Sequence, residues 1–326
     1  MLKFFTKGFF TQYAVIFFIG LTLWMPAIFR HTINYEPNEY WGLLSVAIFN
    51  IAKASGVIGS IIAYLITFAT GLLINQLASN FKLTDRTGTL PLFLFVVLSS
   101  FSTSITGLSP YTLMLPFFVL ILLIVYKHDE KDENIFHSLD AGIIVGILTL
   151  FYYPLALLML LIWIAFASIK GVSWRNFVAT LLGLIFPTFL VYAYFLFTNN
   201  EPAFFAQLTQ MGAPTINHSF LPVTLDSIIT ITIILIILIS AIKVMQQQRN
   251  LTIKQRSYFF ITGFYVFLIL IIQLFFSNQT ITNLFFAPAG SITLTNVLSE
   301  KVKNRWVNGF MVLFIILILF NSLYHI

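Results

Sequence analysis

The sequence predicts an all-α membrane protein, a bundle of about eleven transmembrane helices that forms a single integral membrane domain over residues 1–326. Hydrophobic residues make up 59% of the chain and charged residues only 9%, whereas a soluble domain carries about 25% charged residues. Apolar runs of roughly 15 to 25 residues recur from end to end, each long enough to cross a hydrocarbon core of about 30 Å. In lipid every backbone N–H and C=O must be paired internally, so we expect these runs to be helices.

The apolar runs divide into eleven predicted spans. The tenth, residues 280–298, is the weakest, so a count of ten stays open. The fifth and sixth share residues 141–169, which Tyr152, Tyr153 and Pro154 interrupt. We interpret that stretch as a hairpin of two short helices with a tight turn near the outer boundary, because both of its flanks are charged. The other spans are predicted at residues 13–29, 56–79, 90–105, 111–126, 177–197, 228–244, 258–276 and 307–323.

The basic residues test this layout. Of the 17 Lys and Arg residues, only Arg30 and Lys53 fall on one side of the predicted membrane. By the positive-inside rule the other side is cytoplasmic, with the N-terminus inside. The basic residues on that side are Lys3, Lys7, Lys82, Arg86, Lys127, Lys131, Lys170, Arg175, Lys243, Arg249, Lys254, Arg256, Lys301, Lys303 and Arg305.

Charge and composition also restrict the partners. The net charge of +6 follows from the positive-inside loops, so anionic lipid headgroups are the expected counter-surface and no nucleic acid is needed. The chain has no cysteine, which excludes disulfides, thiol catalysis and Cys-based metal sites. No Asp, Glu, Lys or Arg lies at the middle of a clear span, which counts against an ion-coupled transporter.

The loop after the first span holds the candidate site. It concentrates Arg30, His31, Glu36 and Glu39 within ten residues. A carboxylate near the membrane surface can act as a general base or hold a divalent cation, so Glu36 and Glu39 are the catalytic candidates. Arg30 can grip a phosphate with a bidentate fork, and His31 is a second candidate phosphate contact. Whether a metal takes part is left open.

A plainer interpretation of the same loop is a solvated connection in which Tyr40 and Trp41 belong to an interfacial aromatic belt. The sequence of residues 41–55 predicts an amphipathic or re-entrant helix along the outer surface, which would roof a groove near the lipid headgroups. They could instead form the tilted start of the second span.

Further along, Gly142 and Gly146 form a small-xxx-small pair, typical of close helix packing.

The order of these features resembles the membrane core of the GT-C glycosyltransferases, enzymes that use a polyprenyl-phosphate sugar as donor. The resemblance is one of layout and covers about residues 1–200. It implies that a carboxylate of the first outer loop, here Glu36 or Glu39 where those enzymes carry Asp, is catalytic. The segments that match this layout are the first loop, the helix at 41–55, the turn at 83–91, the hairpin at 140–154 and the helix start at Trp174 and Arg175.

The chain also resembles a polytopic family of unknown function from Gram-negative bacteria, which implies the inner membrane as its location. We therefore expect a GT-C-like protein acting on, or derived from enzymes acting on, a polyprenyl-phosphate-linked sugar at the outer face. The alternatives are a non-catalytic membrane subunit of a cell-envelope complex, with protein partners there, and a transporter or flippase.

Overall fold

The structure is a computed structural model that describes most of the chain. The described residues are 2, 4–6, 8–30, 40–84, 88–101, 107–127, 135–169, 174–209, 225–246, 251–276, 284–300 and 304–324.

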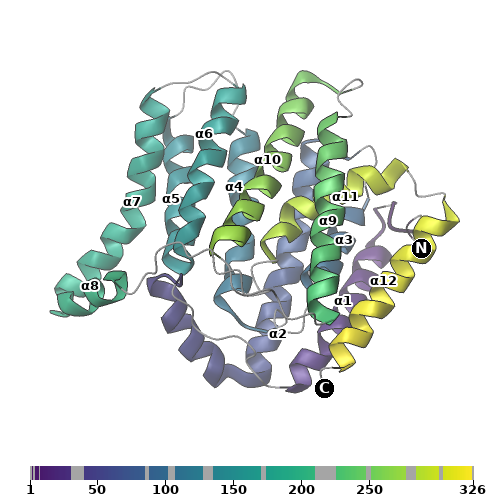
Figure 1. Ribbon diagram of the computed structural model, residues 1–326, viewed down its shortest axis with the longest axis horizontal. Coiled ribbons are helices and arrows are strands. Elements are labelled where there is room, and N and C mark those ends of the chain that lie inside the picture. The colour runs from purple at the N-terminus through teal and green to yellow at the C-terminus, as the bar shows by residue number, and fades with distance from the viewer. Residues whose placement is uncertain are drawn as a thin grey trace.

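Within these ranges the protein is all-helical, as predicted, and the single extended pairing is an isolated bridge between Trp41 and Tyr152. Twelve α-helices are described, one more than the predicted spans, because a short helix occupies part of the predicted outer loop at 198–224 (Figure 1). The elements are η1 (Phe4–Thr6), α1 (Phe10–Arg30), α2 (Leu43–Asn80), α3 (Leu90–Ser99), α4 (Pro110–Lys127), α5 (Ile135–Phe151), η2 (Tyr153–Leu157), α6 (Leu158–Ile169), α7 (Trp174–Phe197), α8 (Glu201–Thr209), α9 (Leu225–Gln246), α10 (Ile253–Phe276), α11 (Ala287–Glu300) and α12 (Arg305–Tyr324).

Five helices are long and apolar enough to cross a membrane: α2, α4, α7, α9 and α10. The chain is therefore a membrane protein by its helix lengths and composition. Six further apolar segments, in α1, α3, α5, α6, α11 and α12, are shorter, so the number of complete spans stays a prediction.

The third predicted span, residues 90–105, differs most from the structure. Its helix, α3, has only 10 residues. The hydroxyls of Ser99 and Ser100 both donate to the carbonyl oxygen of Val96, at 3.0 and 2.6 Å, and α3 ends there. Every residue of α3 is buried among other helices, so this helix does not need the length of a lipid-facing span.

The predicted hairpin between α5 and α6 is confirmed. α5 ends at Phe151, and the next residue, Tyr152, is extended. Helices α5 and α7 run parallel, because Gly142 lies against Thr180 and Gly146 lies against Leu184, four residues further along each helix. Helix α6 connects them and must run the opposite way. The turn is built by η2. α5 has 17 residues and begins at Ile135, before the predicted start of this stretch at residue 141.

The same glycines confirm the predicted close packing. A Cβ atom on Gly142 or Gly183 would collide with the backbone of the facing helix, and a Cβ on Gly146 would lie 2.5 Å from the carbonyl oxygen of Leu184. Small residues let the α5 and α7 backbones approach closely.

The described basic side chains gather at one end of the bundle, with the single exception of Lys53. We call this the basic end; in Figure 1 it is the upper end of α4, α6, α7, α9 and α10. The side-chain amide of Gln255, at the start of α10, donates to the carbonyl oxygen of Lys82 beyond the end of α2, at 2.9 Å. The start of α10 and the end of α2 are therefore in contact at the basic end. The charged side chains there are Lys82, Lys127, Arg175, Lys243, Lys254 and Arg256.

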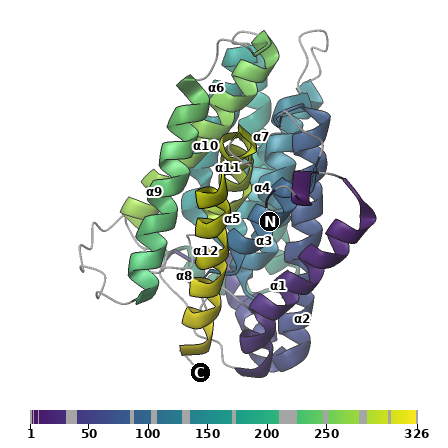
Figure 2. The ribbon, with the colours of Figure 1, turned by 90° about the vertical axis from the view of Figure 1, so that its right-hand side faces the viewer.

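The first and last helices lie side by side (Figure 2). The backbone N–H of Leu2 donates to Oδ1 of Asn308 in the first turn of α12, at 2.8 Å. The N–H of Thr89 donates to the carbonyl oxygen of Phe5, at 2.9 Å, so η1 is also attached to the turn before α3. Helices α1 and α12 therefore start at the same level and run in the same direction.

Helix α2 consists of two segments that meet at Gly56. This residue has φ 50° and ψ −128°, which is not helical. Residues 43–55 lie across the lower end of the bundle, and the longer second segment then rises through it (Figure 1). A separate helix was predicted at 41–55, and the bend confirms one that starts at Leu43; its position along the outer surface of the membrane stays a prediction.

Candidate functional site

The predicted site residues follow α1 directly. Arg30 is the last residue of α1; its side chain lies outside the described part of the structure, and so do His31, Glu36 and Glu39. Their roles as phosphate contacts and as base or metal carboxylates stay predictions. The structure does describe the two segments that this loop connects, the end of α1 and the buried segment that starts at Tyr40.

Tyr40, Trp41 and Gly42 are fixed by backbone hydrogen bonds to the turn between α5 and α6. The N–H of Gly42 donates to the carbonyl oxygen of Phe151 at 2.8 Å, and the N–H of Tyr153 donates to that of Tyr40 at 3.3 Å. A side chain at position 42 would collide with the backbone of α5, so a glycine is required there. The loop of the candidate site is therefore attached firmly at its second end.

Aromatic side chains reinforce this attachment. Trp41 Nε1 donates to the hydroxyl of Tyr111 at 2.7 Å, and the hydroxyl of Tyr152 donates to the carbonyl oxygen of Phe276, the last residue of α10, at 2.6 Å. A helix leaves its last carbonyls without partners, so Tyr152 satisfies one of them. Burial, together with the nearby Tyr111, Tyr40 and Tyr153, raises the pKa of Tyr152, which keeps its hydroxyl a donor.

We call this end of the bundle, opposite the basic end, the aromatic end. It is defined by Tyr40, Trp41, Tyr111 and Tyr152, whose rings pack on one another and on Phe285. Tyr40 is only 1% exposed and Trp41 only 6%. The interpretation of these two residues as an interfacial belt is therefore wrong: they are core residues, because the turn at Tyr152 covers them.

The juxtamembrane segment of α2 begins at this buried anchor. Ser45 Oγ donates to the carbonyl oxygen of Phe151 at 2.5 Å, and Leu43 forms a small apolar cluster with Leu150 and with Phe204 of α8. On its other face Ile51 is 62% exposed. The segment therefore has a packed face toward the bundle and an apolar free face, as an interfacial helix requires.

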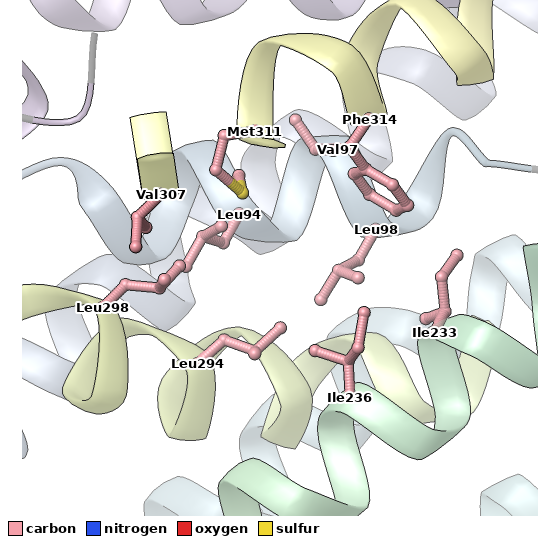
Figure 3. A pocket seen from close by; sticks show the side chains of 10 residues that line it. All are labelled: Leu94, Val97, Leu98, Ile233, Ile236, Leu294, Leu298, Val307, Met311 and Phe314. Carbon is pink, nitrogen blue, oxygen red and sulfur yellow. The ribbon is translucent and has the colours of Figure 1, made fainter. Parts of the chain in front are cut away.

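A cavity lies between α3, α9, α11 and α12 (Figure 3). Its volume is about 80 Å³ and it is partly open. Each lining side chain is apolar, and Figure 3 shows Leu98, Ile236 and Phe314 pointing into it from three different helices. The lining residues are Leu94, Val97, Leu98, Ile233, Ile236, Leu294, Leu298, Val307, Met311 and Phe314.

No three His, Asp or Glu side chains gather closely enough to hold a metal ion in the part of the chain that the structure describes. His137 and Asp140 lie near the basic end, whereas Glu201 lies at the start of α8. The predicted divalent cation concerns Glu36 and Glu39 and is not addressed by these residues.

A protein-family model matches residues 39–326, which include α2 through α12. The chain belongs to DUF6427, a family of unknown function. The matched part of this DUF6427 protein begins at Glu39. It therefore includes one of the two predicted carboxylates, whereas Arg30, His31 and Glu36 precede the match. No curated protein and no solved structure matches the chain.

Two features of the structure were not predicted from the sequence. The aromatic end joins residues 40, 111, 152 and 285, which are far apart in the chain; the only local signal was the Tyr152–Pro154 interruption. The apolar cavity had no signal in the sequence, because its Leu, Ile, Val, Met and Phe lining consists of the residue types that are common throughout the predicted spans.

Proposed function

We propose that this DUF6427 protein is a GT-C-like membrane protein that acts on a polyprenyl-phosphate-linked sugar at the membrane surface beside its aromatic end. Glu36 or Glu39 supplies the base or metal carboxylate, and Arg30, with His31, holds the phosphate. The protein lies in a bacterial inner membrane with its basic end in the cytoplasm.

The attachment of the Arg30–Glu39 loop is the observation that supports this proposal. The loop leaves the end of α1 and re-enters the bundle at Tyr40, whose carbonyl accepts a hydrogen bond from the N–H of Tyr153. The juxtamembrane segment of α2 starts three residues later. The described flanks of the loop, the end of α1 and Tyr40, are thus attached to the bundle on either side of the four candidate residues, which supports a role for those residues in binding a lipid headgroup.

The charge distribution supports the side of the membrane. Lys and Arg residues favour the cytoplasmic face near helix ends, and the described ones gather at the basic end. Tyr40, which directly follows the Arg30–Glu39 loop, lies at the opposite, aromatic end. A sugar donor whose phosphate lies in the outer headgroup layer would meet this loop directly.

The chemistry needs few groups. A guanidinium forms paired hydrogen bonds with phosphate oxygens, and a carboxylate within about 4 to 6 Å of it is held in its charged form. Such a carboxylate can accept the proton of an acceptor hydroxyl. The acceptor oxygen then bonds to the anomeric carbon of the sugar as the bond from that carbon to the phosphate oxygen breaks, and polyprenyl phosphate leaves.

The test uses the full chain in nanodiscs with a radiolabelled polyprenyl-phosphate sugar, and it measures release of the sugar from the lipid. Glu36→Gln and Glu39→Gln keep the shape and remove the charge, and loss of a general base costs about 10² to 10⁴ in rate. We expect one of the two variants to lose activity to this extent. Glu201→Gln is the matched control, because Glu201 is an exposed carboxylate on α8, and it should keep full activity.

Absence of turnover in the wild-type chain with a panel of acceptors, or equal activity in all three variants, would contradict the proposal and favour the non-catalytic subunit. The packing gives transport less support, because the rings of Phe118, Tyr265 and Phe285 fill the space between α4, α10 and α11.

A further inference from the structure

The cavity between α3, α9, α11 and α12 lies among helices that meet lipid. α9 is the most apolar of the five long helices, with a mean hydropathy of 2.8 over its span window. On α12, Met311 faces the cavity, whereas Val312 and Leu313, the next two residues, are 42% and 55% exposed. An apolar exposed face and the apolar cavity lining are therefore both formed by α12; Figure 3 shows the lining side chains.

Water is a poor occupant of this cavity. A buried water needs two to four polar partners, and all ten lining side chains are apolar. An empty cavity is also unfavourable, because its lining side chains lose their dispersion contacts. The free-energy penalty per unit of cavity volume, applied to about 80 Å³, corresponds to an equilibrium that favours the filled cavity over the empty one by a factor of roughly 25.

We propose that this cavity holds a segment of one acyl chain of a membrane phospholipid. A flexible hydrocarbon chain fills an irregular apolar space without requiring a polar partner. In a membrane, phospholipid is also the solvent of the exposed apolar faces of α9 and α12, so its chains surround two of the helices that line the cavity in large excess over any other hydrocarbon. None of the ten lining residues belongs to the Arg30–Glu39 loop, and this proposal does not depend on the function proposed for that loop.

The experiment detects lipid that stays after the annular lipid is removed. The full chain is placed in nanodiscs of phosphatidylethanolamine and phosphatidylglycerol containing a phosphatidylcholine with a diazirine on its acyl chain. The sample is then washed exhaustively in detergent and irradiated, and cross-linked residues are mapped by mass spectrometry. We expect cross-links at Met311 and Phe314, which line the cavity, and few at Leu313, which faces outward.

Val97→Phe adds a ring to the cavity wall and should lower the retained cross-link at Met311 by a factor on the order of 25, the bias that the void produces. Val312→Phe is the same substitution on the exposed face of α12 and should leave the cross-link unchanged. If Val97→Phe, a fully buried position, fails to fold, Val307→Phe at the start of α12 is the second filling variant.

The proposal is overturned if no lipid is retained, if Leu313 is labelled as strongly as Met311, or if both filling variants keep the cross-link. A competition distinguishes the source of the chain. Displacement by polyprenyl phosphate, but not by an equal amount of unlabelled phospholipid, would also overturn it, since the occupant would then be an isoprenoid chain.

Discussion

At the scale of single residues, glycines allow backbone segments of this protein to approach one another closely. Gly42 lets the first loop pair with the turn after α5, and Gly142, Gly146 and Gly183 let α5 and α7 approach closely. By contrast, a Cβ on Gly309 of α12 would meet nothing within 4 Å. A glycine within a membrane helix is therefore not by itself evidence of a helix contact. The contact exists only where the backbone of another helix lies against the glycine.

Gly146→Ala should destabilise the protein by about 1 to 3 kcal/mol, the usual cost of an overpacked core position, because its Cβ would lie 2.5 Å from the carbonyl oxygen of Leu184. Gly309→Ala is the matched control and should be neutral or stabilising by up to about 1 kcal/mol, since alanine is the better helix former. Thermal unfolding in detergent measures both. Equal melting temperatures for the two variants would contradict the parallel packing of α5 and α7.

At the scale of elements, the bend in α2 separates an interfacial segment from a span. Gly56 has a positive φ of 50°, and a Cβ there would meet nothing within 4 Å. Its requirement for glycine is therefore one of backbone conformation alone. The contact of Leu43 with Leu150 and Phe204 then holds the start of the segment against α5 and α8.

Gly56→Ala should either cost about 1 to 3 kcal/mol of strain or let α2 straighten, which would move residues 43–55 away from α8. The chain has no cysteine, so spin labels at Asn50→Cys and Asn200→Cys report the distance between these elements. We expect a longer or broader distance distribution in Gly56→Ala and an unchanged one in Gly309→Ala. An unaltered distribution together with unaltered stability would show that the bend does not need glycine.

At the scale of the whole molecule, charge and apolar length predicted the order of the helices and the hairpin at Tyr152. The prediction succeeded because one span too many or too few would have moved every later basic loop to the other side of the predicted membrane. The length of α3 could not be predicted in this way, because burial by neighbouring helices removes the requirement to span lipid. The aromatic end and the cavity depend on contacts between distant segments, which hydropathy does not report.

Labelling of single cysteines tests the orientation of the bundle. Asn50 and Ser79 are both exposed and lie toward opposite ends of α2. In intact cells an impermeant maleimide should label Asn50→Cys and should label Ser79→Cys only after the membrane is opened, because the end of α2 at Ser79 adjoins the basic end. Labelling of both positions in intact cells would refute the positive-inside orientation, and with it the outer position of Glu36 and Glu39.

The contact between Leu2 and Asn308 has a consequence for biosynthesis. The ribosome makes η1 and α1 first and α12 last, yet the amide of Leu2 is satisfied by a side chain of α12. Until α12 leaves the insertion machinery, the flank of α1 that it covers stays open to lipid or to a chaperone. Chains released before residue 308 would carry this open flank permanently, and membrane quality control could recognise them by it.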